Sequence, residues 1–137
     1  MAMQDVRWKQ RFDNFDRAFL LLREVQERGV DTLSQLEKEG AIRRFAFTFE
    51  LAWKTLKDYL ETQGIILRES SPRTVIKEAF ATGILEDARL WMDIMNHRNL
   101  LSHTYAFKTF DEALKQVETR YFAAFDRLHE FFLSESA

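Results

Sequence analysis

The chain of 137 residues contains no cysteine, one proline and four glycines. Without cysteine it can form no disulfide framework, zinc knuckle or iron–sulfur cluster, and it has no thiol nucleophile. The low content of glycine and proline argues against an all-β fold, which needs many turns. The length suits one domain with a single core. We therefore expect one domain over residues 1–137, with a frayed tail at 133–137.

Strong charge and long apolar runs are also missing. Twenty basic residues oppose 22 acidic ones, for a net charge of −2. A chain with this balance has no broad excess of positive charge to bind phosphates, so we expect no DNA partner. Any RNA chemistry must then be confined to a local site. Residues 1–11 contain no apolar signal core, and no apolar run is long enough to cross a bilayer. We expect a soluble, cytoplasmic protein that does not bind membranes.

What the sequence does contain is helical periodicity. Apolar residues recur at steps of three and four in four long segments. These stripes are Trp8, Phe12, Phe15, Phe19 and Leu22; Phe45, Phe49, Trp53, Leu56 and Leu60; Leu85, Ala88, Trp91 and Met95; and Leu114, Val117, Tyr121, Phe125 and Leu128. We interpret the aromatic residues as a core rather than a cofactor site, with surplus apolar surface packing on another copy. The predicted fold class is all-α, an antiparallel up-and-down bundle of four long helices plus one short helix.

Helix boundaries carry recognisable signals. Every glycine or proline except Gly40 falls at an expected boundary. Ser34 and Glu37 can form a capping box for the second helix, whose start we place between residues 34 and 41. The pair Ser71-Pro72 should begin the short helix. Thr109, with a glutamate three residues later, is a second possible capping box that would open the last helix.

The basic residues show no binding motif. We interpret them as solvated helix faces because apolar positions separate them and acids lie nearby. The residues are Arg7, Lys9, Arg11, Arg43 and Arg44. No glycine-rich phosphate loop is present. The chain also lacks the Gly-Ser and Asp-x-Asp pattern of a nucleotidyltransferase, so we expect no such active site in it.

One pair of residues has metal-ligand spacing. Asp93 and His97 are four residues apart, which places both on one helical face. No third ligand has suitable spacing, and a carboxylate–imidazole pair on a helix surface is the commoner arrangement. We expect no metal and no other cofactor.

A polar block at residues 96–105 is the candidate site. Histidine moves protons near neutral pH, and arginine can bind a phosphate with two hydrogen bonds. Together, Arg98 and His103 could support metal-free cleavage of a phosphodiester by its own 2′-hydroxyl. Five residues of helix turn through about 140°, so the two side chains converge only if the helix ends between them or if two chains contribute. The alternative, a polar helix end with a purely structural role, stays open.

The spacing Arg98-Asn99-x-x-x-His103-x-Tyr105 resembles the R-x4-H-x-Y signature of HEPN-domain proteins. Residues 44–57 resemble the second-helix segment of the HepT-like, nucleotidyltransferase substrate-binding branch. Residues 71–73 and 76–80 resemble its short third helix. Asn96 and His97 stand where many relatives carry acidic residues.

The resemblance implies a homodimer whose two motifs face a shared cleft. It also implies a separately encoded minimal nucleotidyltransferase as partner, with RNA or a nucleotide at the cleft. In such toxin–antitoxin pairs Arg98 would polarise the scissile phosphate and His103 would be the general acid and base. Asn99 would orient the motif, and the partner would inactivate the toxin by adding AMP to Tyr105.

Two alternatives accompany this ribonuclease toxin hypothesis. The chain could be a non-catalytic nucleotide-binding or substrate-binding subunit of a two-component nucleotidyltransferase, or a structural helical adaptor. Glu50 either leans toward the motif across the bundle or forms a surface pair, and we favour the surface pair.

Overall fold

The computed structural model describes residues 3–137 and contains only helices within that range. The α-helices are α1 (Met3–Arg28), α2 (Gln35–Thr62), α3 (Pro72–Ala81), α4 (Ala88–Leu101), α5 (Phe107–Gln116) and α6 (Phe122–Ser136). A 3-10 turn at Val30–Thr32 follows α1, and a π-helical turn at Val117–Tyr121 joins α5 to α6 without a break. The predicted bundle of four long helices and one short helix is confirmed.

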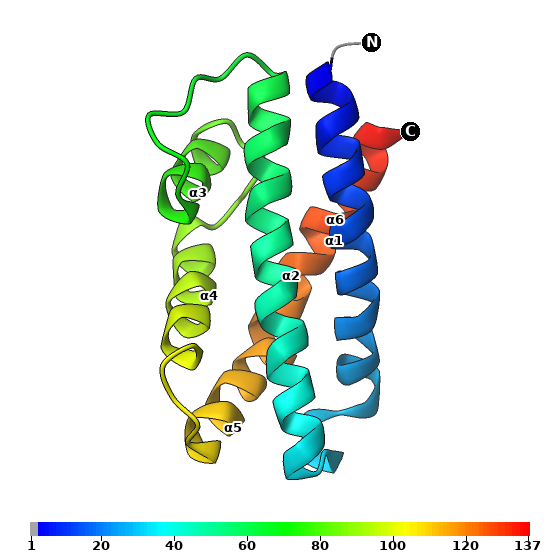
Figure 1. The fold of residues 1–137 in the computed structure, drawn as a ribbon, viewed down its shortest axis with the longest axis vertical. Helices are drawn as coiled ribbons and strands as arrows, with labels where there is room; N and C mark the ends of the chain where they lie inside the picture. The colour runs from blue at the N-terminus through cyan, green and yellow to red at the C-terminus, as the bar shows by residue number, and fades with distance from the viewer. Residues whose placement is uncertain (1–2) are drawn as a thin grey trace.

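The helices pack as an elongated bundle (Figure 1). α1 and α2 run antiparallel, side by side. α6 packs against α1, and the last helix passes behind α1 and α2 in the view of Figure 1. α3 and α4 lie on the other side of α2, and α5 contacts the first half of α2. None of the helices within residues 3–137 combines the length and the hydropathy that a bilayer span requires.

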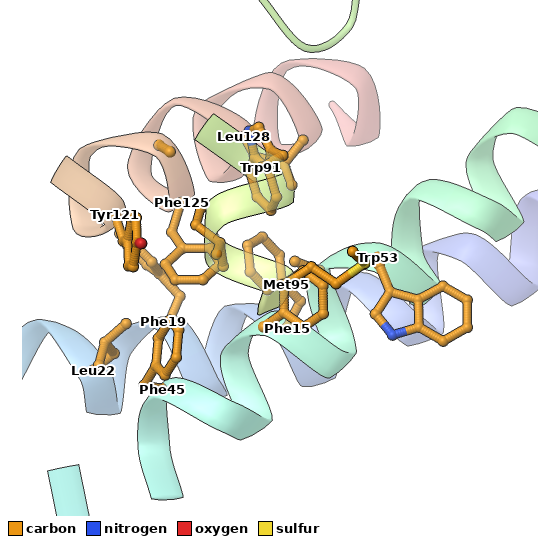
Figure 2. Close-up of a cluster of buried hydrophobic side chains, with 14 of the residues drawn as sticks. Phe15, Phe19, Leu22, Phe45, Trp53, Trp91, Met95, Tyr121, Phe125 and Leu128 are labelled. Atoms are coloured by element: carbon orange, nitrogen blue, oxygen red, sulfur yellow. The ribbon is translucent and has the colours of Figure 1, made fainter. Parts of the chain in front are cut away.

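The predicted aromatic stripes meet in one core. Figure 2 shows side chains from α1, α2, α4 and the last helix converging between the helices. Phe15, Phe45 and Phe125 are fully buried, and all three lie in predicted stripes. Such burial contributes about 1.5–3 kcal/mol for each large apolar side chain, so these stripes hold the bundle together.

The start of α2 agrees with its predicted signal. The hydroxyl of Ser34 accepts a hydrogen bond from the backbone N–H of Glu37, and the Glu37 carboxylate accepts one from the backbone N–H of Ser34. This capping box begins the helix at Gln35. The predicted start with Ser71 as cap and Pro72 as first helical residue is also confirmed for α3.

The last helix does not begin where the second capping box predicted. α5 starts at Phe107, Ala106 is its N-cap, and no side chain caps it. Thr109 is already inside the first turn. The hydroxyl of Thr104 accepts a hydrogen bond from the backbone N–H of Ala106, and this local turn directs the chain into the helix early.

The π-helical turn was not predicted. Within it the backbone N–H of Phe122 donates to the carbonyl of Val117 rather than to that of Glu118. The carbonyl of Glu118 instead accepts a hydrogen bond from Nε2 of Gln26 at 2.9 Å. The widened turn therefore links the last helix to the end of α1.

Two expectations about the surface differ from the structure. Arg11 is not simply solvated, because its Nε lies 3.1 Å from the carboxylate of Asp58, which is 3% exposed. The last helix also continues to Ser136, where a frayed tail was expected. The hydroxyl of Tyr59 donates to the carboxylate of Glu135, which fastens the last turn to α2.

Candidate functional site

The polar motif lies where α4 ends. The helix stops at Leu101, between Arg98 and His103, so the condition for their convergence is met within one chain. The backbone carbonyl of Asn99 accepts hydrogen bonds from both the N–H and the hydroxyl of Ser102, at 3.3 and 2.7 Å. Asn99 thus closes the end of the helix through its backbone, and its side chain is exposed.

Arg98 points toward α2 rather than into solvent. Its Nη2 lies 3.1 Å from Oε1 of Glu50, and about 30% of each side chain is exposed. The Nε of Arg98 is buried and has no hydrogen-bond partner within residues 3–137. Glu50 therefore holds the guanidinium from one side.

Glu50 is a neighbour of the motif, and its carboxylate makes both of the contacts that the sequence left open. Its second carboxylate oxygen lies 3.3 Å from the indole N–H of Trp53 and 3.7 Å from the ammonium of Lys54. It therefore forms the expected pair on its own helix, but it also reaches Arg98 on α4. The sequence favoured the surface pair, because a contact between helices depends on how they pack.

A pocket of about 570 Å³ opens beside Arg98, between the first half of α2 and the end of α4 with the loop that follows. We call it the α2–α4 pocket. Its floor is formed by the apolar residues Ile42, Ala46, Leu101 and Phe110. An apolar hollow of this size with a few polar groups is typical of a small-molecule or nucleotide site.

The polar groups of this pocket include two residues of the motif. Arg98 and Tyr105 both line it, together with Ser102, Thr104 and Arg43. Tyr105 is 90% exposed, so it is open to solvent at the edge of the pocket. His103 lies on the exposed turn after α4, and its backbone N–H donates to the carbonyl of Leu100. The structure thus brings Arg98 and Tyr105 to one pocket, with His103 on the turn between them in sequence.

Asp93 and His97 do not form the expected pair. Asp93 makes a salt bridge with Arg120 at 3.0 Å, and Nδ1 of His97 lies 2.5 Å from the hydroxyl of Tyr121. Burial lowers the pKa of His97, although Asp93 nearby opposes the shift. Burial also raises the pKa of Tyr121, so both groups are neutral near pH 7. Each partner lies on the last helix, which sequence spacing within α4 does not reveal.

Metal ligation has no support in the part of the chain that the structure describes. No group of three or more histidine, aspartate or glutamate side chains there is arranged to hold a metal ion. The polar side chains at the end of α4 and in the loop after it include guanidinium, imidazole and hydroxyl groups.

The sequence also matches known proteins. Residues 10–134 match the model of a family described as nucleotidyltransferase substrate binding protein like. A stretch of 69 residues is 32% identical to the protein named probable ribonuclease HepT from Haemophilus influenzae. That match covers 48% of this chain and 47% of the relative, so it spans about half the length of the relative.

A solved structure agrees in fold. A crystal structure of a protein from Thermus thermophilus superposes with a TM-score of 0.71 and 31% sequence identity. The match covers 89% of this chain and 98% of the other.

Proposed function

This chain belongs to the nucleotidyltransferase substrate binding protein like family, which is HEPN-like, and from that premise we propose that it is a metal-independent ribonuclease and the toxin of a toxin–antitoxin pair. The single observation that carries the proposal is the position of Arg98 and Tyr105 in one pocket where α4 ends, with His103 on the turn after that helix. The likeness to the protein named ribonuclease HepT supports the same reaction class.

The proposed reaction is an internal transfer of a phosphodiester. The 2′-hydroxyl of a ribose loses its proton and attacks the adjacent phosphorus, and the bond from phosphorus to the 5′-oxygen of the next nucleotide breaks. The products are a 2′,3′-cyclic phosphate and a free 5′-hydroxyl. His103 exchanges protons at the reacting oxygens, and Arg98 stabilises the charge that develops on the phosphate. Asn99 supports the motif by closing the helix.

Regulation would act through Tyr105. We propose that a separately encoded minimal nucleotidyltransferase transfers AMP to its hydroxyl. The exposure of Tyr105 and its place beside Arg98 support this step, because an anionic nucleotide there would compete with the substrate phosphate.

A homodimer in the cytoplasm is the assembly we propose. Phe47 on α2 and Leu100 on α4 are at least half exposed, and neither lines the α2–α4 pocket. A second copy covering these side chains would bring two motifs together.

Expression of the chain without its partner tests the proposed reaction. Wild-type protein should slow growth and cleave single-stranded RNA in the presence of a metal chelator, and the products should carry 2′,3′-cyclic phosphate ends. The His103→Ala variant should do neither. Equal effects of both proteins would refute the ribonuclease. Intact-mass analysis after co-expression with the nucleotidyltransferase should show AMP adducts that disappear in Tyr105→Phe.

The family description favours a second candidate, a non-catalytic substrate-binding subunit of a two-component nucleotidyltransferase. Purified protein that binds a nucleotide but leaves RNA intact would support this alternative.

A further inference from the structure

Gly40 is a residue that neither the fold nor the site described so far explains. It lies inside α2 and does not have the positive φ of the boundary glycines. Glycine is unfavourable inside a helix because it costs more backbone entropy than alanine. A Cβ atom built at Gly40 would meet no atom within 4 Å, so the packing of residues 3–137 does not require glycine there. The missing side chain instead leaves the backbone open to a molecule outside the chain.

Gly40 lies at the edge of the α2–α4 pocket. The floor of this pocket is apolar, and its volume of about 570 Å³ lies within the range of small-ligand sites. Figure 1 shows the first half of α2 running beside α5 and the end of α4, which are the walls of this pocket. A flat, largely apolar group could therefore lie on the floor and approach the backbone of α2 at Gly40.

The charge at the pocket indicates an anionic ligand. Arg43 follows Gly40 by three residues and so lies on the same face of α2. No acidic side chain within residues 3–137 forms a salt bridge with Arg43, and its guanidinium lies 5.1 Å from the centre of the Phe47 ring. Arg98 lines the same pocket with a side chain that is 30% exposed, and Glu39 is the acidic residue at its edge. The two arginines can bind the phosphate of a nucleotide, and the apolar floor can contact its base.

We propose that the α2–α4 pocket holds one nucleotide of a single-stranded RNA. Its base lies against the apolar floor and the backbone at Gly40, and its phosphate lies between the guanidinium groups of Arg43 and Arg98. Single-stranded RNA suits such a site because its bases can turn out of the stack, and guanidinium groups bind phosphates with two hydrogen bonds. The inference rests on the proposed ribonuclease function, because it assigns this nucleotide to the substrate beside Arg98.

Binding measurements on uncleaved RNA test the pocket. Every protein carries His103→Ala, and the probe is a short fluorescein-labelled single-stranded RNA followed by fluorescence anisotropy. Gly40→Leu, which adds a bulky side chain at the edge of the pocket, should weaken binding by about tenfold or more. Arg43→Gln should weaken it severalfold. Arg7→Gln is the matched control, since Arg7 is exposed at the start of α1, at the opposite end of the bundle from the start of α2 (Figure 1), and loses the same charge. Its dissociation constant should not change.

The stability of the variants separates a binding effect from a folding effect. Gly40→Leu replaces glycine with a strong helix former in open space, so its melting temperature should be equal to or higher than that of the parent. Gly40→Ala, a smaller change, should be stabilised in the same way and should lose less affinity. The proposal therefore predicts that the Gly40 variants are at least as stable as the parent and bind RNA more weakly.

Three results would overturn the proposal. The first is full RNA affinity in both Gly40→Leu and Arg43→Gln, and the second is no binding of RNA by the His103→Ala parent. The third is a change in the molar mass of Gly40→Leu by light scattering, which would assign this face to a second copy of the chain. RNA cleavage by the wild type is scored separately. If the wild type cleaves RNA but the pocket variants bind it normally, only the pocket proposal is rejected. If the wild type does not cleave RNA but the pocket variants bind it more weakly, only the ribonuclease proposal is rejected.

Discussion

Arg98 on α4 and Glu50 on α2 form a salt bridge of 3.1 Å that joins the motif helix to the centre of the bundle. Glu50 is itself held by the indole N–H of Trp53, so the position of the guanidinium is set by α2 as well as by its own helix. The residue expected to contact phosphate is therefore oriented before any substrate arrives.

The first prediction concerns this pair. Replacing Glu50 with Gln should lower the free energy of unfolding by about 1 kcal/mol, because the bridge is only partly exposed and loses its charge. It should also raise the KM for RNA more than it lowers kcat, since Arg98 becomes free to move. Urea denaturation and steady-state cleavage measure the two effects.

A double-mutant cycle with Arg98→Ala and Glu50→Gln provides the check on this pair. Strictly additive losses of stability would show that the two side chains do not interact in solution. Lys54→Gln is the control, since Lys54 is 3.7 Å from Glu50 and 42% exposed. Its effect on stability should stay within about 0.5 kcal/mol.

The second prediction concerns Asp58, a carboxylate whose side chain is 2% exposed and faces Arg11. Arg11→Met should destabilise the protein by about 3 kcal/mol, because it leaves a buried charge with only Lys57 at 3.9 Å. Thermal or urea unfolding measures the loss. Arg7→Met, on an exposed part of the same helix, should change stability by no more than about 0.5 kcal/mol. Similar losses in the two variants would argue against the buried pair.

The third prediction follows from His97. Burial lowers its pKa in the folded protein below the ordinary value of 6.5, and Arg120 adds to the shift against the opposing carboxylates of Asp93 and Glu112. The unfolded chain therefore binds more protons than the folded one as pH falls below about 6.5. The contribution of neutral His97 to stability is complete above that pH and is lost as pH falls through the folded pKa.

Urea unfolding at several pH values between 7.5 and 4.5 tests this prediction, with the pH range chosen to bracket the titration of histidine, about 6.5. Replacing His97 with Gln should make stability fall less steeply in the acidic range. An unchanged slope in His97→Gln would mean that another group causes the acid loss. Tyr121→Phe should leave the ring of residue 121 buried while removing the hydroxyl that His97 contacts.

The fourth prediction compares two residues that looked alike in the sequence. Ser34→Ala should cost about 1 kcal/mol, because the hydroxyl of Ser34 caps α2. Thr109→Ala should cost clearly less, since Thr109 lies inside α5 and caps nothing. Unfolding curves of the two variants under the same conditions decide the matter. Equal losses would contradict the observed start of α5.

The bundle could be predicted because its causes are local. Period and capping are properties of neighbouring residues, and the capping box at Ser34 and the glycine turn after Leu60 both follow from them. The site was found in the same way, since Arg98 and Tyr105 belong to one short motif. The structure places both in one pocket, while the roles of the motif residues stay predictions.

What could not be predicted depends on the packing of one helix against another. Glu50 reaches Arg98, and Arg11 reaches Asp58, only because α2 packs beside α4 and α1. His97 likewise finds Tyr121 on the last helix rather than Asp93 on its own. Spacing in the sequence assigns each of these residues to a local pair or to solvent, because it contains no information about interhelical distance.

The widened turn at Val117–Tyr121 determines how the helical segments before and after it are rotated relative to each other. Compared with an α-helix, such a turn accommodates one additional residue, which is equivalent to a rotation of about 100° between the segments on either side. α5 uses its face against α2, and α6 uses its face against α1. Deleting one residue from the turn would give a regular helix, but it would rotate the apolar side of α6 away from α1. The irregular turn thus sets the rotation between the two halves of one long helix, so that each half packs on its own neighbour.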